Sequence, residues 1–440
     1  MAPPPGLLFI RAGLLLLAAR TTTTGDVGLL LFAVAKQDQD ALLPKHSFSK
    51  PPVSPFGKQN PYNHTMTYRP LGKTGLRVST LSYGAWLTFS SNSNQIETIE
   101  KAKEILTACV KSGINFFDNA ESYGSFHGES ELIMGEALRQ MTEEDELVTR
   151  QELVLTTKLF NVRGDGINNK GLSRKHILEG MQGSLQRLQL SYIDVVYAHR
   201  FDPTTPLEET VRAFNYLLDH GKALYWGTSE WTSEQIRNAV RIAEKLNLVG
   251  PIVEQPLYNL VNRDRVELEY LPLLQNSNNG FDGIGLGLTT YSPLAEGILA
   301  GRYLKANGKA PENSRGVYKD RLLERKEELA LAEKLNPLAE SLGVTLAQLI
   351  LAWTMQNPFV SSVIMGASRV EQVSDNVKAV ELAQTLFAPL PSSTKSKKPK
   401  VENLKEKIEA IAKEFGFSLG VDKIQAMVKD AFVSHRGELL

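Results

Sequence analysis

The sequence predicts an α/β domain at residues 66–388, folded as a closed (β/α)8 barrel of parallel strands. Two observations indicate this class. Short apolar runs rich in β-branched and aromatic residues alternate eight times with longer helical patterns over ~320 residues. The runs are apolar along nearly their whole length, as parallel strands are when both faces are buried. An open doubly wound sheet is the rival, but no GxGxxG motif follows the first strand.

The first four βα units are each recognised by one apolar run and the helical pattern after it. Strands are expected at residues 77–86, 114–120, 153–158 and 194–199. Helices are expected at residues 97–113, 128–140, 173–190 and 205–221. Gly113 should end the first helix, because glycine adopts the left-handed conformation readily. Ser173 should cap the third, because its hydroxyl can accept a free backbone N–H.

The last four units are less regular. Strands are expected at residues 223–229, 252–255, 285–294 and 360–366. One helix is expected to end near Leu246, and a long helical stretch is expected after residue 320. Two more helices are expected at residues 345–357 and 369–382. The long stretch indicates that extra helices interrupt the barrel pattern near its end.

Composition excludes several classes of function. Lys plus Arg and Asp plus Glu each number 49 in the 440 residues, so no net charge favours nucleic acid, and we expect none as a partner. The single cysteine, Cys109, excludes an internal disulfide and a cysteine-based metal site. Cys109 lies in an amphipathic helical pattern, so a small core residue is favoured over a reactive thiol. We expect no metal.

Residues 1–65 differ from the rest of the chain. Their apolar runs are interrupted by Arg11 and Arg20, and none reaches the roughly 18 continuous apolar residues of a membrane span. Basic residues, a threonine run and a small-residue stretch also occur in cleaved targeting peptides. An extension without function is the other interpretation, since Met66 immediately precedes the first domain-like residues. We expect a cytoplasmic protein, with organelle targeting or membrane association through this segment as the alternative.

Residues 389–440 form a third region. Residues 390–400 are basic and rich in turn-forming residues, which is typical of a connector. Residues 401–416 have the apolar spacing of an amphipathic helix with both charge signs on its outer face. We expect this helix to pack on the barrel, and a partner-binding helix is the alternative.

Four polar residues at or just past the ends of predicted strands suit one reaction: Asp118, Tyr123, Lys158 and His199. A carbonyl that accepts hydride needs a proton donor at its oxygen, and the Tyr123 hydroxyl can supply it if a nearby ammonium eases its deprotonation. Asp118 would hold Lys158 by a salt bridge. His199 would orient the carbonyl by a hydrogen bond. Side chains at the ends of different strands are typical of a barrel active site.

These residues, with several longer segments, resemble the aldo-keto reductase superfamily, and within it the branch that contains the voltage-gated potassium channel beta subunits. The resemblance extends from Tyr68 to Leu382. The segments that carry it are residues 68–86, 115–124, 171–200, 205–231, 249–259 and 291–303. His199 stands where the animal channel subunits have Asn, so the chain is most similar to the version found outside animals.

The resemblance implies NADPH-dependent reduction of aldehydes or ketones to alcohols on a TIM barrel. Asp118, Tyr123, Lys158 and His199 match the catalytic tetrad of the family. Tyr123 would be the general acid, and Lys158 would lower its pKa. The alternative is a regulatory subunit that binds a potassium channel alpha subunit and senses redox state through reductase chemistry. The branch also implies a homotetramer.

The resemblance also places the nicotinamide end of NADPH. Ser229 and Gln255 match residues that hydrogen-bond the carboxamide, and Tyr291 matches the aromatic residue that stacks on the ring. Glu230 stands where a channel subunit has Arg, so that contact is not carried over. Trp86 follows the first strand at a position that lines the substrate mouth beside the cofactor.

Later segments match the rest of the cofactor. The residues that match the pyrophosphate contacts and the covering loop are Ser292, Pro293, Leu294, Arg302, Ser314 and Arg315. The residues that match the adenosine end are Gly366, Ser368, Gln372, Asp375 and Asn376. Free N–H groups where a helix begins near Ser368 suit a phosphate. Arg369 adds a charge that the channel subunits lack, and either selects NADPH over NADH or is a solvated surface residue.

Overall fold

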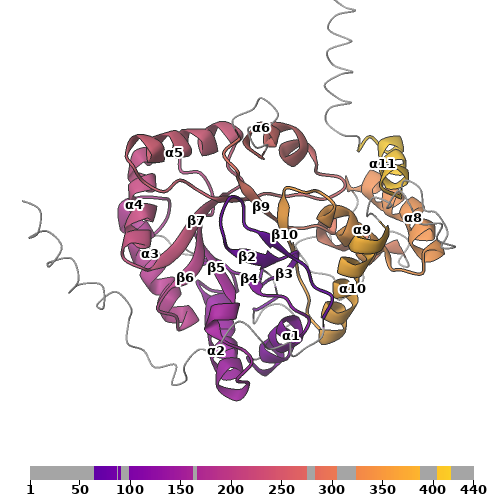
Figure 1. The fold of residues 1–440 in the computed structure, drawn as a ribbon, viewed down its shortest axis with the longest axis horizontal. Helices are drawn as coiled ribbons and strands as arrows, with labels where there is room; N and C mark the ends of the chain where they lie inside the picture. Colours follow the sequence, from indigo (N-terminus) through magenta and orange to yellow (C-terminus); the bar gives the residue numbers. More distant parts are fainter. Residues whose placement is uncertain are drawn as a thin grey trace, which may run out of the picture. The chain divides into compact units, whose positions relative to one another are not determined.

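The predicted barrel is confirmed in a computed structural model that describes residues 64–86, 88–90, 99–161, 166–274, 283–304, 324–386 and 404–417. Eight parallel strands close in the order β10-β3-β4-β5-β6-β7-β8-β9, with helices around them (Figure 1). The strands are β3 (Leu81–Gly84), β4 (Phe116–Asp118), β5 (Val154–Leu159), β6 (Ile193–Ala198), β7 (Ala223–Ser229), β8 (Val253–Gln255), β9 (Gly287–Thr290) and β10 (Val360–Met365). Their residues are buried on both faces almost throughout, which explains their near-continuous apolar sequences.

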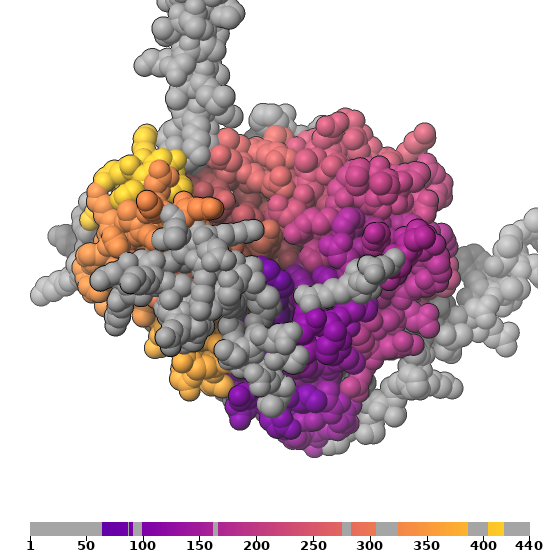
Figure 2. All heavy atoms as spheres, turned by 180° about the vertical axis from the view of Figure 1, so that it is seen from behind, coloured from indigo at the N-terminus to yellow at the C-terminus, as the bar shows by residue number. Residues whose placement is uncertain are grey.

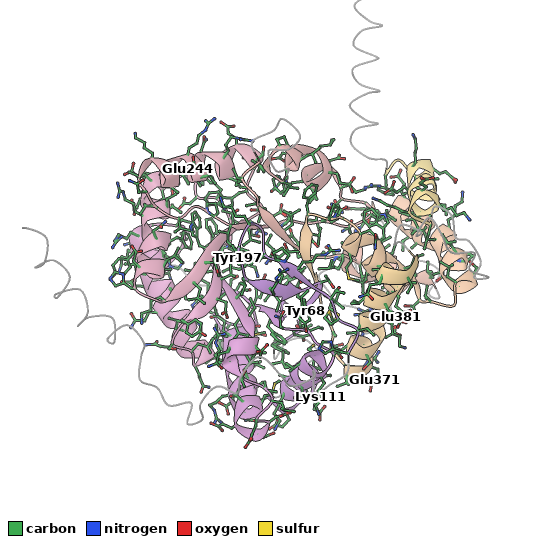
Figure 3. The ribbon with its side chains drawn as sticks, viewed as in Figure 1. Tyr68, Lys111, Tyr197, Glu244, Glu371 and Glu381 are labelled. Atoms are coloured by element: carbon green, nitrogen blue, oxygen red, sulfur yellow. The ribbon has the colours of Figure 1, made fainter. Side chains whose placement is uncertain are left out.

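The helices of the outer layer follow the predicted periodicity. Those of the first five units are α1 (Ile99–Lys111), α2 (Glu129–Glu144), α3 (Arg174–Leu188), α4 (Leu207–Asp219) and α5 (Ser233–Lys245). Ser173 caps α3, since its hydroxyl accepts the backbone N–H of His176 at 3.2 Å. Gly113 adopts φ 84° just past α1, the left-handed conformation expected after a helix end. Figure 3 shows Lys111 and Glu244 on outer helices, whereas Tyr197 lies among the strands.

The prediction of one continuous first strand at residues 77–86 is wrong. Residues 77–86 contain two strands, because the chain leaves a hairpin before it enters the barrel at β3. The hairpin pairs β1 (Tyr68–Pro70) antiparallel with β2 (Arg77–Ser79). Its Leu71 and Val78 are fully buried in one cluster with Phe116, Val154, Val195 and Val253 from the barrel strands. The hairpin therefore closes the end of the barrel at which the strands begin.

Extra helices interrupt the pattern after β8, as expected near the end of the barrel. They are a π-helix at Arg265–Glu269, α6 (Leu271–Leu274), the 3-10 helix Ala295–Ala300, and α8 (Lys326–Ser341), which precedes α9 (Leu346–Met355). The last barrel helix is α10 (Val370–Leu386). In the described part of the chain no single helix is long and apolar enough to cross a membrane. Taken together, α8 and α9 have sufficient length and apolar composition, but the two helices are bent by 94° at the break between them.

The predicted C-terminal helix is present as α11 (Leu404–Glu414) and packs beside α8 (Figures 1 and 2). Its Leu404, Ile408 and Ala412 are buried. Arg263 donates to Glu409 at 3.3 Å and so joins the helix to the segment after β8. At the N-terminal side of the domain, the hydrogen bonds include a residue before Met66. The side chain of Gln384 in α10 donates to the carbonyl of Thr65 at 3.3 Å.

Candidate active site

The four residues of the predicted catalytic set lie together where the strands end. Asp118 is the last residue of β4, Lys158 is near the end of β5, and His199 follows β6 directly. Tyr123 lies in the loop after β4. Parallel register places Lys158 beside Tyr197 on the neighbouring strand. Barrel closure therefore brings side chains from three successive βα units to one point.

Lys158 is fully buried and connects the set. Its ammonium donates to Asp118 Oδ2 at 2.5 Å, to the carbonyl of Asn119 at 2.8 Å and to the Tyr123 hydroxyl at 3.1 Å. An ammonium has three N–H donors and no acceptor, so these contacts use all of its capacity. The Tyr123 oxygen is therefore an acceptor toward Lys158, and its own proton is directed elsewhere.

Asp118 is buried with further donors around it. Its Oδ1 accepts the Thr156 hydroxyl at 2.9 Å and the Gln255 amide at 3.0 Å. This ring of donors stabilises a buried carboxylate and fixes the position of Lys158. Sequence patterns did not identify Thr156, since its role depends only on the β4–β5 register.

The pKa of Tyr123 shifts opposite to the direction expected from Lys158 alone. Burial raises the pKa of the Tyr123 phenol well above 10, and Asp118 raises it further, while Arg200 lowers it. Burial is the largest of these causes, so it decides the direction of the shift in the unliganded site. Burial likewise lowers the pKa of Lys158, against the opposing effect of Asp118. Tyr123 is thus protonated at neutral pH, as a proton donor must be.

His199 is a neutral imidazole beside Tyr123. The two rings meet edge to face with centroids 5.8 Å apart. Burial lowers the pKa of His199 well below 6.5, and Lys158 and Arg200 lower it further. Its Nδ1 is buried without a hydrogen-bond partner among the described residues. A neutral imidazole retains one N–H, which can be donated to a carbonyl oxygen.

The positions expected at the nicotinamide end are side by side. Ser229 ends β7 and donates to the carbonyl of Gln255, which ends β8, at 3.0 Å. The side-chain amide of Gln255 donates to Asp118 at 3.0 Å, so Gln255 is coupled to the predicted catalytic set. Tyr291 follows β9, is partly exposed and pairs with Leu257. Trp86 is 43% exposed after β3.

The backbone that follows Tyr291 is unusual. Ser292 has φ 51°, and Ala295 and Glu296 also lie in the left-handed region at 46° and 61°. Asn259 holds the Ser292 carbonyl at 2.9 Å. Strained backbone conformations of this kind persist only where surrounding contacts hold them in place, and they occur often at ligand sites. Pro293 is buried and Leu294 is partly exposed.

The positions expected at the adenosine end lie at the start of α10. Gly366 is exposed, and an added Cβ would meet only Thr88, at 3.8 Å. The amide oxygen of Gln372 accepts the Ser368 N–H at 2.8 Å and hydroxyl at 3.2 Å. Arg369 is exposed at the same helix start. The Ser368 N–H, expected to be free for a phosphate, is thus taken by Gln372, whereas Gly366 leaves open space beside the positive end of the helix.

The other expected cofactor residues differ in their surroundings. Asp375 accepts from Gln348 at 2.8 Å, and Asn376 is buried and donates to the sulfur of Met365 at 3.3 Å. Both side chains are therefore engaged by other residues of the protein, although Asp375 is 39% exposed and also pairs with Lys378 at 3.3 Å. Arg302 is exposed after the turn at Gly301. Ser314 and Arg315 lie outside the described residues. No group of three His, Cys, Asp or Glu with metal-binding geometry occurs among those described.

Comparisons with known proteins agree with the geometry. The model of the Aldo/keto reductase family matches residues 80–388. A protein of Oryza sativa subsp. japonica named probable voltage-gated potassium channel subunit beta is 50% identical over 326 residues, 73% of this chain and 93% of the relative. An Arabidopsis thaliana protein of the same name is 50% identical over 327 residues, again 73% of this chain and 93% of the relative. A Schizosaccharomyces pombe protein named putative voltage-gated potassium channel subunit beta is 44% identical over 327 residues, which are 72% of this chain and 89% of the relative.

Proposed function

The chain belongs to the aldo/keto reductase family, and we propose that it reduces aldehydes or ketones to alcohols with NADPH. One observation carries the proposal. The Tyr123 hydroxyl accepts from a buried ammonium that Asp118 holds, and a neutral His199 lies beside it. A proton donor and a second hydrogen-bond donor thus converge on the place where a carbonyl oxygen would develop negative charge.

The chain's own residues handle the proton. Tyr123 gives its hydroxyl proton to the carbonyl oxygen, and the O–H bond of the alcohol forms. Lys158 stabilises the phenolate that remains, because its N–H already points at that oxygen at 3.1 Å. His199 donates to the carbonyl oxygen and orients it. Asp118 holds Lys158 in place throughout.

The residues present fit NADPH as the hydride source. Tyr291 offers a partly exposed aromatic ring, and the exposed Arg302 and Arg369 offer positive charge. The open backbone at Gly366 and the start of α10 suit a phosphate. When bound, NADPH supplies the hydride that becomes the new C–H bond and leaves as NADP⁺. Ser229, Gln255 and Tyr291 would hold its nicotinamide.

The test is NADPH oxidation by the purified full chain against a panel of aldehydes and ketones. Tyr123→Phe keeps the ring and removes only the proton donor, so carbonyl reduction should fall by about 10²-fold or more. NADPH affinity, measured by fluorescence titration, should change little. Turnover at the wild-type rate in this variant would remove Tyr123 from the role of acid.

A second candidate function is favoured by the names of the relatives, which are called potassium channel beta subunits. We propose as the alternative that this chain binds a channel alpha subunit, with the reductase site as a redox sensor, and that it assembles as a homotetramer. Co-purification with the cytoplasmic part of such a channel, and light scattering for the tetramer, test this directly. Rapid turnover without channel binding would favour the enzyme.

A further inference from the structure

Arg200 is a charged residue at the active site that the catalytic set does not use. It follows His199 at the end of β6 and is partly exposed. Its Nη1 donates to the carbonyl of His199 at 2.5 Å and to the Ser229 hydroxyl at 3.2 Å. The guanidinium therefore lies across the ends of β6 and β7, between the residue that would orient the carbonyl and one that would hold the nicotinamide.

The guanidinium has unused donors. Guanidinium groups carry five N–H donors in a planar fork that matches a carboxylate. Both hydrogen bonds of Arg200 come from Nη1, and neither Nε nor Nη2 donates to any described residue. No carboxylate of the described ranges forms an ion pair with it. At the ends of the neighbouring strands, Lys158 pairs with Asp118, and Glu230 pairs with Arg265 at 3.0 Å.

The charge balance of the site is consequently positive. The buried Lys158–Asp118 pair is neutral as a unit. His199 is uncharged at neutral pH, because burial, then Lys158 and then Arg200 lower its pKa. Arg200 also lowers the pKa of Tyr291, against the larger effects of burial and Glu230, so its charge reaches the expected nicotinamide position as well. Of the charged groups named here, all among the described residues, Arg200 is the one without an ion-pair partner.

We propose that Arg200 binds a carboxylate on the carbonyl substrate, so that this site prefers oxo acids and aldehyde acids over neutral carbonyl compounds. The inference rests on the proposed reductase function and names its substrate class. The free edge of the guanidinium takes the carboxylate, while Tyr123 and His199 engage the carbonyl oxygen. A charge-assisted hydrogen bond of this kind contributes enough to change kcat/KM by about tenfold to a hundredfold.

The competing explanation is purely structural, with Arg200 only joining the ends of β6 and β7. The two roles differ in what a substitution changes. Loss of a structural brace reduces the turnover of every substrate by the same factor. Loss of a carboxylate contact reduces only the turnover of acids, so the ratio of kcat/KM for an acid and its ester separates the two and is insensitive to a general loss of activity.

The experiment uses the full chain with NADPH and matched substrate pairs. The 2-, 3- and 4-carboxybenzaldehydes are compared with their methyl esters, which keep the ring and the aldehyde and remove the charge. We expect one acid isomer to exceed its ester by about tenfold or more in kcat/KM. Arg200→Met should bring that ratio close to one, and Arg200→Lys should retain part of it. Arg212→Met, which removes an exposed arginine of α4, should leave the ratio unchanged.

A binding measurement keeps the test independent of turnover. Calorimetric titration of the protein with NADP⁺ present compares benzoate with benzamide, and benzoate should bind at least about tenfold more tightly. Arg200→Met should remove that difference. Equal binding of the two compounds by the wild type, or an acid-to-ester ratio that survives Arg200→Met, would overturn the inference. Turnover of esters without any preference for acids would overturn it while the reductase function stands.

Discussion

Lys158→Met should destabilise the protein far more than an ordinary surface substitution, because it leaves a buried carboxylate without its cation. Methionine has about the length of lysine and lacks the ammonium. The side chains of Lys158 and Asp118 are 0% and 4% exposed, and the atoms that pair are 2.5 Å apart. The substitution therefore removes the charge with little change in packed volume.

The expected magnitude follows from the burial of the pair. Removing one partner of a buried ion pair costs about 3–5 kcal/mol, most of it the cost of the remaining unpaired charge. Asp118 would keep the Thr156 hydroxyl and the Gln255 amide as donors. These two neutral hydrogen bonds offset part of the loss, so we expect a value near the lower end, about 3 kcal/mol.

The assay is equilibrium unfolding in urea at pH 7, followed by circular dichroism. With a slope of about 3 kcal/mol per molar, the midpoint should fall by about 1 M. Lys103→Met is the matched control, since Lys103 pairs with the exposed Glu144 at 2.8 Å. That surface pair should contribute less than about 1 kcal/mol.

The decisive comparison is the double variant Lys158→Met with Asp118→Asn. A neutral amide needs no cation, so the double variant should regain about 2 kcal/mol relative to Lys158→Met alone. If the two variants unfold at the same urea concentration, the instability comes from packing and not from an unpaired charge. A loss below about 1 kcal/mol in Lys158→Met would also refute the argument.

Three further outcomes follow from other parts of the site. His199→Asn should slow single-turnover decay of NADPH fluorescence by about 10²-fold while NADPH affinity stays within a few fold; unchanged decay would make His199 structural. Arg369→Ala should weaken NADPH by about tenfold or more and NADH much less in a binding titration, whereas equal weakening would assign Arg369 to the solvated surface. Burial raises the pKa of Glu254 to about 8 from 4.5, so its contribution to stability is present at low pH and lost as the pH rises from 4.5 to 8. Glu254→Gln should abolish that part of the pH dependence in urea unfolding, and an unchanged slope would contradict it.

The sequence alone predicted the barrel, which the structure confirms, and the four residues of the candidate catalytic set, which the structure brings together. Apolar runs and helical periodicity are local properties, and so are caps such as Ser173. The rule that parallel strands end at one edge was enough to bring Asp118, Lys158 and His199 together. Local patterns failed at residues 77–86, where an apolar run contains both a hairpin strand and a barrel strand. Periodicity cannot report which of two sheets a strand joins.

The tertiary structure decided which groups surround those residues. Gln255 reaches Asp118 across 137 positions of sequence, and that contact exists only because the barrel closes. The same closure buries the Tyr123 hydroxyl near Asp118, and burial first and Asp118 second raise its pKa. It also leaves Arg200 beside Ser229 without a carboxylate partner among the described residues. Electrostatic effects depend on distances through space, and a sequence specifies those distances only after the chain has folded.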